Sequence, residues 1–358
     1  MFWQNKRVLV TGHTGFKRSW LSYALSQLGA QVTGYSLAPE MTPNLYSIAD
    51  IANKTRSIIG DIRDREALKT TFKTVKPDIV FHLAAQPIVL TGYREPHLTY
   101  ETNVMGTVNV LECIRESDSV RSFVNVTTDK VYVNKEWIWG YRENEPLDGF
   151  DPYSNSKSCS ELVTHCYSRS FFSNSNGPAI STARAGNVIG GGDFAADRII
   201  PDCVRALMRD DSLIIRNPNS IRPYQFVLEP LQAYMLIAEK TFVDKKMQGW
   251  YNIGPDYDDC VSTLDLVSLF GTAIKPLSLN VSVEQRTDSP HEAGVLKLDN
   301  AKIKTELNWR SMADINTAVR FTADWYREYL GEGNVADVME RQIKVYFKDL
   351  ILHGGVNV

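Results

Sequence analysis

A tyrosine and a lysine spaced four residues apart are the residues best suited to chemistry in this chain. In "DPYSNSK" (151–157), Tyr153 and Lys157 would share one face of a helix. A lysine ammonium beside a phenol favours the phenolate and brings its pKa toward neutrality, as a general base for hydroxyl oxidation requires. The spacing alone is a weak signal, because many helices carry it as a solvated pair.

A second group of polar residues, "TTDK" (127–130), ends a β-branched run upstream of that pair. Thr128 is placed to hydrogen-bond a reacting hydroxyl. Asp129 and Lys130 add a carboxyl and an amine at the carboxyl edge of a sheet, although in isolation they would equally suit an exposed turn. Together with Tyr153 and Lys157, these three residues form the predicted catalytic set.

A glycine turn near the N-terminus predicts a cofactor site. Gly12 and Gly15, in "RVLVTGHTGFKRSW", follow a strand and precede a helix, so backbone N–H groups and the helix N-terminus would face a pyrophosphate. The third glycine of the G-x-x-G-x-x-G pattern is replaced by Arg18. The alternative is a glycine-rich turn that binds nothing.

Later strand ends support the cofactor interpretation. "GDIRD" (60–64) places Asp61 where an adenine edge would lie, and "HLAAQP" (82–87) supplies small residues where a ribose or nicotinamide must approach. The second strand ends in "GYSL" without a carboxylate for the ribose hydroxyls, so Ser36 neither selects NAD nor excludes NADP. The predicted cofactor-binding residues are Gly12, His13, Thr14, Gly15, Phe16, Lys17, Arg18, Ser36, Asp61, Ile62, Leu83, Ala84, Ala85, Gln86, Asn103, Thr127, Tyr153 and Lys157.

The elements that must position these residues alternate between short apolar strands and helices. This alternation predicts an α/β fold, a Rossmann-type doubly wound parallel sheet with a smaller mixed α/β substrate-binding lobe. The expected strands span residues 7–12, 31–36, 56–61, 78–85, 122–128, 179–186 and 249–254. The expected domains are an NAD(P)-binding domain (1–188 plus about 221–262), a substrate-binding lobe (189–220 and 263–335) and a helical tail (336–358).

Composition excludes several other classes. The chain has 358 residues, 43% of them hydrophobic, and a formal net charge of −3, which gives no general attraction to nucleic acid or anionic lipid. Its five cysteines are scattered without a C-x-x-C pair, which is typical of reduced thiols. The N-terminus lacks an apolar signal region and no run of 18 apolar residues occurs, so a cytoplasmic protein without a membrane partner is expected. His82, His165 and His291 show no metal-ligand spacing, and no metal is expected.

Longer stretches resemble the extended short-chain dehydrogenase/reductase family and, within it, the CDP-glucose 4,6-dehydratases. The resemblance covers nearly the whole chain to about residue 330. "YVNKEWIWGYRENEP" is far more specific to this subgroup than any glycine motif. The other stretches that carry it include "FWQNKRVLVTGHTGFK", "DPYSNSKSCSELV", "RAGNVIGGGDFAADRIIPD", "IIRNPNSIRPYQFVLEPL" and "PHEAGVLKLD".

The resemblance implies a reaction and a cofactor. The family converts an NDP-glucose, here CDP-glucose, to the 4-keto-6-deoxy sugar and water, in deoxysugar and O-antigen-type (lipopolysaccharide) biosynthesis. It uses NAD, and NADP is not excluded. Tyr153 would take the C4 hydroxyl proton, Asp129 would protonate the leaving C6 hydroxyl, and Lys130 would remove the C5 proton. Such roles require Asp129 to be held protonated and the pKa of Lys130 to be lowered.

The same resemblance implies substrate contacts and a quaternary structure. Guanidinium groups match phosphate oxygens, although each arginine alone would equally suit a surface ion pair. A homodimer is implied, formed by the helix that contains Tyr153 and the one near residues 99–116. The implied substrate-binding residues are Gln86, Asn187, Arg198, Arg216, Arg222, His291 and Glu292.

Several positions depart from the family pattern and weaken the assignment of nucleotide and sugar. Leu90 stands where the family has arginine, and Phe226 stands where it has histidine. Losing a polar partner from a pocket costs roughly 1–3 kcal/mol. The other changed positions are Val131, Val133, Ser289, Gly294 and Val295.

Two alternatives remain open from the sequence. One is a 4-epimerase, or a dehydratase for another NDP-sugar, although an epimerase needs no acid–base pair such as Asp129 and Lys130. The other is a non-catalytic sugar-nucleotide-binding protein. Arg18 must swing outward or crowd the phosphates, and we predict a cofactor that binds but is held less firmly than in glycine-bearing relatives.

Overall fold

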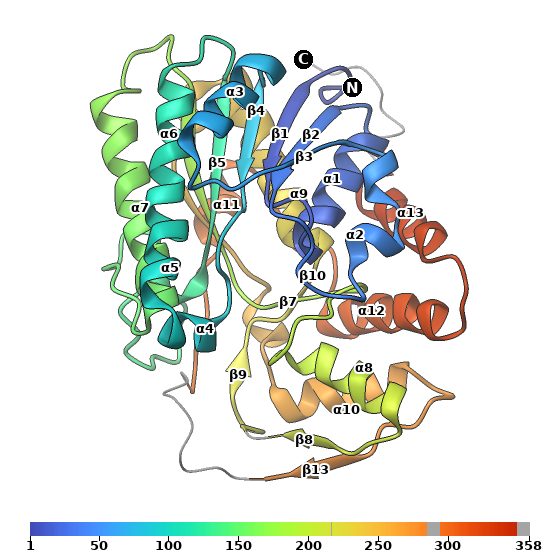
Figure 1. Cartoon of the computed structure of the whole chain (residues 1–358). Coiled ribbons are helices and arrows are strands. Elements are labelled where there is room, and N and C mark those ends of the chain that lie inside the picture. Colours follow the sequence, from blue (N-terminus) through green and yellow to red (C-terminus); the bar gives the residue numbers. More distant parts are fainter. Residues whose placement is uncertain (216, 285–293, 349–358) are drawn as a thin grey trace.

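The fold is built on a parallel sheet that carries the expected strands. The computed structural model describes residues 1–215, 217–284 and 294–348 (Figure 1). Within this part of the chain, seven parallel strands form the central sheet in the order β11-β6-β5-β4-β1-β2-β3. These strands are β1 (Arg7–Thr11), β2 (Gln31–Ser36), β3 (Arg56–Ile59), β4 (Ile79–His82), β5 (Ser122–Thr128), β6 (Ala179–Ala185) and β11 (Trp250–Ile253).

Helices cover both faces of this sheet, as Figure 1 shows. One face packs against α1 and α9, and the other against α3, α6 and α7. The helices are α1 (Phe16–Gln27), α2 (Leu45–Ile48), α3 (Arg65–Val75), α4 (Val89–Arg94), α5 (Pro96–Tyr100), α6 (Gly106–Arg115), α7 (Pro152–Ser170), α8 (Ile199–Arg209), α9 (Leu228–Val243), α10 (Thr263–Ala273), α11 (Ala301–Glu306), α12 (Ile315–Leu330) and α13 (Val335–Tyr346).

Side-chain alternation along each strand explains why both faces are covered. In β1, Val8 and Val10 belong to the core on the α1 and α9 side, whereas Leu9 belongs to the core under α3 and α6. In β5, Phe123 and Val124 divide between the two cores in the same way. Successive side chains of a strand point to opposite faces, so strands that are apolar at every position need helices on both sides.

A smaller lobe lies below the carboxyl edge of the sheet in Figure 1 and contains α8 and α10. It is completed by three short strand pairs and by α12, which packs against α10. The pairs are β7 (Val188–Ile189) with β10 (Gln225–Phe226), β9 (Ile221–Arg222) with β12 (Val261–Ser262), and β8 (Leu213–Ile215) with β13 (Val281–Val283).

The predicted fold class is confirmed, and each expected strand is present with its end moved by at most a few residues. The C-terminal segment is helical over α13, and residues 349–358 lie outside the described part of the chain. The chain passes between sheet and lobe more than once, since β11 returns to the sheet after β7–β10. The predicted domain limits stay a prediction.

Candidate active site

The glycine turn after β1 has the shape that a dinucleotide diphosphate needs. Gly12 has a φ of +79°, and a methyl group there would lie 2.9 Å from the Ala84 backbone. Gly15 is the N-cap residue of α1, and no side chain caps this helix end. The N–H groups of the first helical turn are therefore left for an anion. These features fit the diphosphate of NAD.

The polar side chains of the turn form hydrogen bonds with the neighbouring strands β2 and β3. The His13 ring is buried, lies 2.7 Å from Ser57 Oγ through Nε2, and covers Gly34. Burial lowers the pKa of His13 to about 4. Thr14 Oγ1 lies 2.8 Å from Ser36 Oγ. His13, Thr14 and Ser36 thus fix the turn against β2 and β3.

Lys17 and Arg18 place two cationic side chains in the first turn of α1, next to the glycine turn. The Arg18 side chain lies across the turn, with Nη1 2.5 Å from the position of a Cβ on Gly15. Lys17 Nζ donates a hydrogen bond to Tyr234 Oη at 3.3 Å. Burial, helped by Arg198 and Arg18, lowers the pKa of Lys17 to about 7. Arg18 therefore lies over the glycine turn, whereas Lys17 reaches toward α9.

The carboxylate of Asp61, expected at an adenine edge, is held by Arg63. Arg63 Nη2 donates to Asp61 Oδ2 at 2.6 Å, and the Arg63 backbone N–H donates to Oδ1 at 2.9 Å. Although burial opposes ionisation, these bonds lower the pKa of Asp61. Ile62 is buried and packs on Gly106. Any adenine contact from Asp61 must share the carboxylate with Arg63.

The segment after β4 is fixed by hydrogen bonds to its neighbours. Thr11 Oγ1 accepts from the N–H groups of Leu83 and Ala84, both at 3.1 Å. Asn103 Nδ2 donates to Gln86 O at 3.1 Å and to Ser156 Oγ at 2.9 Å. The Gln86 amide itself bonds Thr99 on α5 and the Ile88 N–H, so Gln86 ties this segment to α5 and Asn103 ties it to α7.

Tyr153 and Lys157 lie at the start of α7, as the spacing predicted. Asp151 caps this helix by accepting from the Ser154 N–H, and Pro152 occupies its first turn. On α4, Gly92 approaches Tyr153 closely, because a methyl group there would lie 3.1 Å from the Tyr153 nitrogen. Local capping and this contact together fix where the phenol emerges.

The expected lowering of the phenol pKa is wrong for the structure as described. Burial raises the pKa of Tyr153 to about 12, against the lowering effect of a hydrogen bond with Thr128. Lys157 is buried and donates from Nζ to Val126 O at 2.9 Å. Burial and the nearby Arg18 lower the pKa of Lys157 to about 8. The lysine is therefore tied to the strand, and desolvation of the phenol outweighs the effect of its hydrogen bond with Thr128.

Asp129 has the environment of a general acid. It is buried at the end of β5; its Oδ1 accepts from Thr128 Oγ1 at 2.9 Å, and its Oδ2 is buried without a hydrogen-bond partner in the described chain. Burial raises the pKa of Asp129. Lys130, in the next position, is half-buried. Thr127 Oγ1 points away from both and donates to Glu161 Oε1 at 2.5 Å.

The substrate-side residues divide between those that the structure brings to the site and those that it does not describe. Arg198 pairs with Asp193 at 2.9 Å, which raises the pKa of Arg198. Its charge acts on Tyr153 and Arg18, so it faces the catalytic group. Arg222 is buried, donates to Ile221 O and acts on Asp129. Asn187 is half-buried and contributes its backbone oxygen to Gln225. Arg216, His291 and Glu292 lie outside the described residues.

Phe226, which stands at a position expected to line the pocket, lies in the hydrophobic core instead. Phe226 is fully buried, with ring centroids 6.2 Å from Trp20, 5.3 Å from Phe321 and 5.7 Å from Tyr346. A phenyl ring in this aromatic cluster stabilises the packing of α1 against α12 and α13. Leu90, by contrast, is half-buried on α4, the helix that approaches Tyr153.

Glu161 is a site residue that the sequence analysis missed. Its carboxylate is buried beneath the catalytic strand and accepts from Arg184 Nη2 at 2.6 Å as well as from Thr127. It lies four residues after Lys157 and eight after Tyr153 on the same helix, so the helical period alone would have placed it on the catalytic face. Its charge acts on Lys157.

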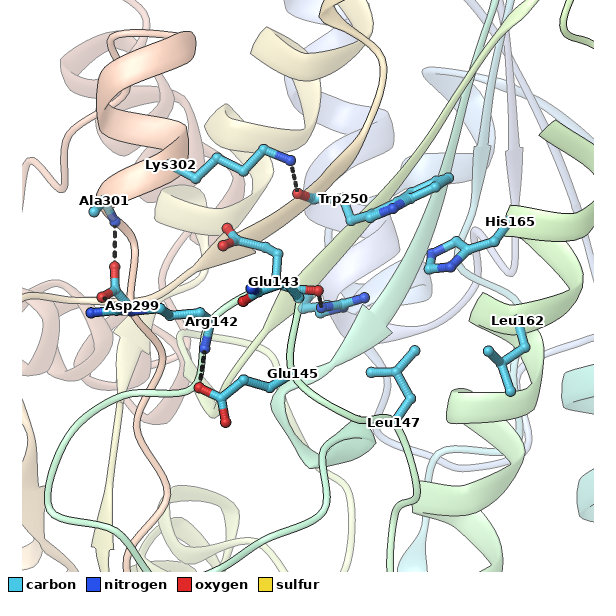
Figure 2. A pocket seen from close by; sticks show the side chains of 12 residues that line it. Arg142, Glu143, Glu145, Leu147, Leu162, His165, Trp250, Asp299, Ala301 and Lys302 are labelled. Atoms are coloured by element: carbon cyan, nitrogen blue, oxygen red, sulfur yellow. Dashed lines mark hydrogen bonds and ion pairs between the residues drawn. The ribbon is translucent and has the colours of Figure 1, made fainter. Parts of the chain in front are cut away.

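A separate cleft of about 710 Å³ lies beside the edge strand β11 (Figure 2). Its charged residues are used to cap that edge. Lys302 Nζ donates to Trp250 O at 2.9 Å, and the Asn252 N–H donates to a Glu143 carboxylate oxygen at 2.9 Å. The ring centroids of His165 and Trp250 lie 3.6 Å apart. Side chains thus satisfy backbone groups that an edge strand would otherwise expose.

Neither a metal-binding cluster nor a membrane-spanning helix is found among the residues that the structure describes. In residues 1–215, 217–284 and 294–348, no group of three or more histidine, cysteine, aspartate or glutamate side chains could hold a metal ion. In the same ranges, no helix is long and apolar enough to cross a membrane.

Comparison with known proteins places this arrangement among sugar-nucleotide enzymes. The family model described as GDP-mannose 4,6 dehydratase matches residues 9–322. A CDP-glucose 4,6-dehydratase of Salmonella typhimurium is 44% identical over 355 residues, covering 96% of this chain and 97% of that protein. The human dTDP-D-glucose 4,6-dehydratase is 29% identical over 333 residues, covering 90% of each.

Solved structures share the fold at low identity. A UDP-glucose-4-epimerase from Stenotrophomonas maltophila, with bound NAD and formylated UDP-arabinopyranose, superposes with a TM-score of 0.79 at 20% identity, over 92% of this chain and 100% of that one. A dTDP-glucose 4,6-dehydratase from Bacillus anthracis in complex with NAD gives 0.75 at 20% identity, over 92% and 98%. These likenesses support the fold.

Proposed function

The chain belongs to the GDP-mannose 4,6 dehydratase family, and from that premise we propose that it converts CDP-glucose to CDP-4-keto-6-deoxyglucose and water. It is an NAD-dependent nucleotide-sugar 4,6-dehydratase. The choice of CDP-glucose is supported by the 44% identity to the Salmonella enzyme. The observation that carries the reaction type is Asp129, a buried carboxyl of raised pKa beside Thr128, near the Tyr153–Lys157 pair.

NAD⁺, when bound, supplies an acceptor for hydride from the sugar and a donor for its return. Gly12, Gly15 and the first turn of α1 would hold its diphosphate. Tyr153, in its phenolate form, accepts the proton of the C4 hydroxyl as this carbon becomes a ketone. Thr128 hydrogen-bonds Tyr153 and aligns it with Asp129.

Water elimination then uses the residues at the end of β5. A ketone at C4 makes the C5 proton acidic, and Lys130, as the neutral amine, removes it. Asp129 gives its proton to the C6 hydroxyl, which leaves as water. The acid role requires the protonated form of Asp129, and burial favours that form by raising the pKa of Asp129. A 4-epimerase needs no proton donor at C6, which favours the dehydratase.

Two further features of the proposal concern the assembly and the cell. A homodimer would form through α7 and the α5–α6 region, where Met105 and Leu162 are each 52% exposed. A cytoplasmic location is consistent with five cysteines that are all free thiols.

A substrate panel tests this function. The protein is incubated with NAD⁺ and CDP-, UDP-, GDP- or dTDP-glucose, and mass spectrometry follows the loss of one water. We expect loss of water with CDP-glucose at the highest kcat/KM. An unchanged mass with an inverted C4 centre would instead identify an epimerase. Failure of the purified protein to bind NAD⁺ would identify a non-catalytic homologue.

A further inference from the structure

The Arg18 side chain lies over the face of the glycine turn that the glycines leave open. A Cβ on Gly15 would be 2.5 Å from Arg18 Nη1 and 3.3 Å from its Cδ. A Cβ on Gly12 would be 3.0 Å from the same Cδ. The second glycine of this turn is the one that lets a diphosphate approach the backbone. The arginine side chain therefore fills the approach to Gly15.

Nothing in the described part of the chain fixes the guanidinium there by a hydrogen bond or an ion pair. Burial and the like charge of Arg198 lower the pKa of Arg18 to about 10. Two acidic groups, Tyr153 and Glu40, act to raise the pKa of Arg18. Glu40 is exposed in the loop that follows β2, and its charge acts on Arg18. An arginine side chain is long and flexible, so the guanidinium can move from its position over Gly15 to one beside Glu40.

We propose that Arg18 is a movable gate on the cofactor site. The side chain must leave Gly15 before a dinucleotide diphosphate reaches the N–H groups of α1, and Glu40 pairs with the guanidinium once it has left. This inference rests on the proposed function, because it assumes that the turn binds NAD. Its consequence is a cofactor that exchanges with the solution instead of being retained through many turnovers.

The gate explains why electrostatic attraction alone does not decide the effect of Arg18. A cation near a diphosphate attracts it, but Lys17 and Arg198 already supply positive charge near Arg18. The bonds from backbone N–H groups to the diphosphate form only when the guanidinium has moved. Part of the binding free energy is therefore spent on displacing the side chain.

Cofactor binding, measured without any sugar, tests the gate. The dissociation constant and the release rate of NADH are measured by fluorescence for the wild type, Arg18→Ala and Arg56→Ala. Arg56 is exposed on β3, so its replacement removes a charge without clearing the turn. We expect Arg18→Ala to bind about tenfold tighter, which corresponds to about 1.4 kcal/mol, and to release NADH more slowly. Arg56→Ala should behave as wild type.

Glu40→Gln provides the second arm. It should weaken NADH binding about threefold in the wild-type background and leave Arg18→Ala unchanged. Equal weakening in both backgrounds would show that Glu40 contacts the cofactor itself and would refute the pairing. Weaker or unchanged binding by Arg18→Ala would refute the gate while leaving the proposed function intact. Absence of NADH binding in every variant would overturn both.

Discussion

Desolvation acts on two residues of the site with opposite consequences for catalysis. It raises the pKa of Asp129, which favours the protonated form that an acid for the leaving hydroxyl requires. It also raises the pKa of Tyr153 to about 12, which disfavours the phenolate. Thr128 and Arg198 act to lower the pKa of the phenol, but burial outweighs them and favours the neutral phenol.

Replacing the proposed acid separates oxidation from elimination. Asp129→Asn keeps the size of the side chain but cannot protonate the C6 hydroxyl. We expect the rate of water loss to fall by about 10²–10⁴-fold. Oxidation at C4 should persist, so reduced cofactor should accumulate by absorbance when CDP-glucose is added. Loss of both signals would show that Asp129 is needed for binding or folding rather than as the acid.

Replacing the proposed base removes both steps. Tyr153→Phe deletes the phenol oxygen and leaves the ring, so oxidation at C4 should fall by about 10²–10⁴-fold. NADH binding, measured by fluorescence, should remain. Water loss at the wild-type rate would contradict the assignment of Tyr153.

At the level of elements, the carboxyl end of β4 is fixed by a neutral histidine. Thr11 Oγ1 accepts two backbone N–H groups and so gives its own hydrogen to His82 Nδ1, 2.8 Å away. His82 Nε2 lies 3.1 Å from Thr107 Oγ1, which donates to Asn103 O. A proton on Nδ1 would place two donors face to face. Burial accordingly lowers the pKa of His82 to about 3.

This histidine makes stability depend on pH. Between the unfolded pKa of about 6.5 and the folded value of about 3, the unfolded chain binds a proton that the folded chain does not, so stability falls as pH falls. In urea unfolding between pH 6 and 4.5, His82→Gln should reduce the slope of the unfolding free energy by about 1.4 kcal/mol per pH unit. His97→Gln, at an exposed site, is the control and should keep the wild-type slope. An unchanged slope for His82→Gln would contradict the neutral buried ring.

A buried ion pair joins α7 to β6 beneath the catalytic residues. Arg184 and Glu161 are both fully buried, and Arg184 Nη1 also donates to Tyr132 Oη at 2.6 Å. Although burial opposes ionisation, Arg184 lowers the pKa of Glu161 below its usual range. The ion pair thus holds β6 against α7, and the hydrogen bond from Thr127 to Glu161 holds β5 against the same helix.

Removing one member of this pair should be costly. Arg184→Met leaves the Glu161 carboxylate buried without its cation, and we expect a loss of about 3–5 kcal/mol in the free energy of unfolding. Adding Glu161→Gln should recover part of that loss, since the uncompensated charge is gone. Chemical denaturation of the two variants measures both effects. No recovery in the double variant would show that packing, and not charge, sets the cost.

For the whole molecule, the two faces of the sheet differ in what covers them. The α1 and α9 side continues into the main core, which includes α12 and α13, whereas α6 and α7 lie on the outer flank in Figure 1. Exposed apolar side chains such as Met105 and Leu162 lie in this flank. Isolated exposed apolar residues are common, so the assembly needs a direct measurement.

The proposed dimer predicts a specific response to charge. Leu162→Asp places a carboxylate on the outer face of α7 and should convert the protein to a monomer in light scattering after gel filtration. Leu264→Asp, at a 40% exposed site on α10 in the smaller lobe, should leave the mass unchanged. A dimer that survives Leu162→Asp would place the interface elsewhere.

Local sequence patterns by themselves determined several features of this chain. These are the seven sheet strands, the glycine turn, the start of α7 at "DP" and the shared face of Tyr153 and Lys157. These follow from side-chain periodicity and capping, which act over a few residues. The position of Arg18 across the turn, the core location of Phe226, the pairing of Glu161 with Arg184 and the raised pKa values of Asp129 and Tyr153 were decided by the tertiary structure. Each depends on desolvation or contact with segments distant in sequence, whose distance in space no local pattern specifies.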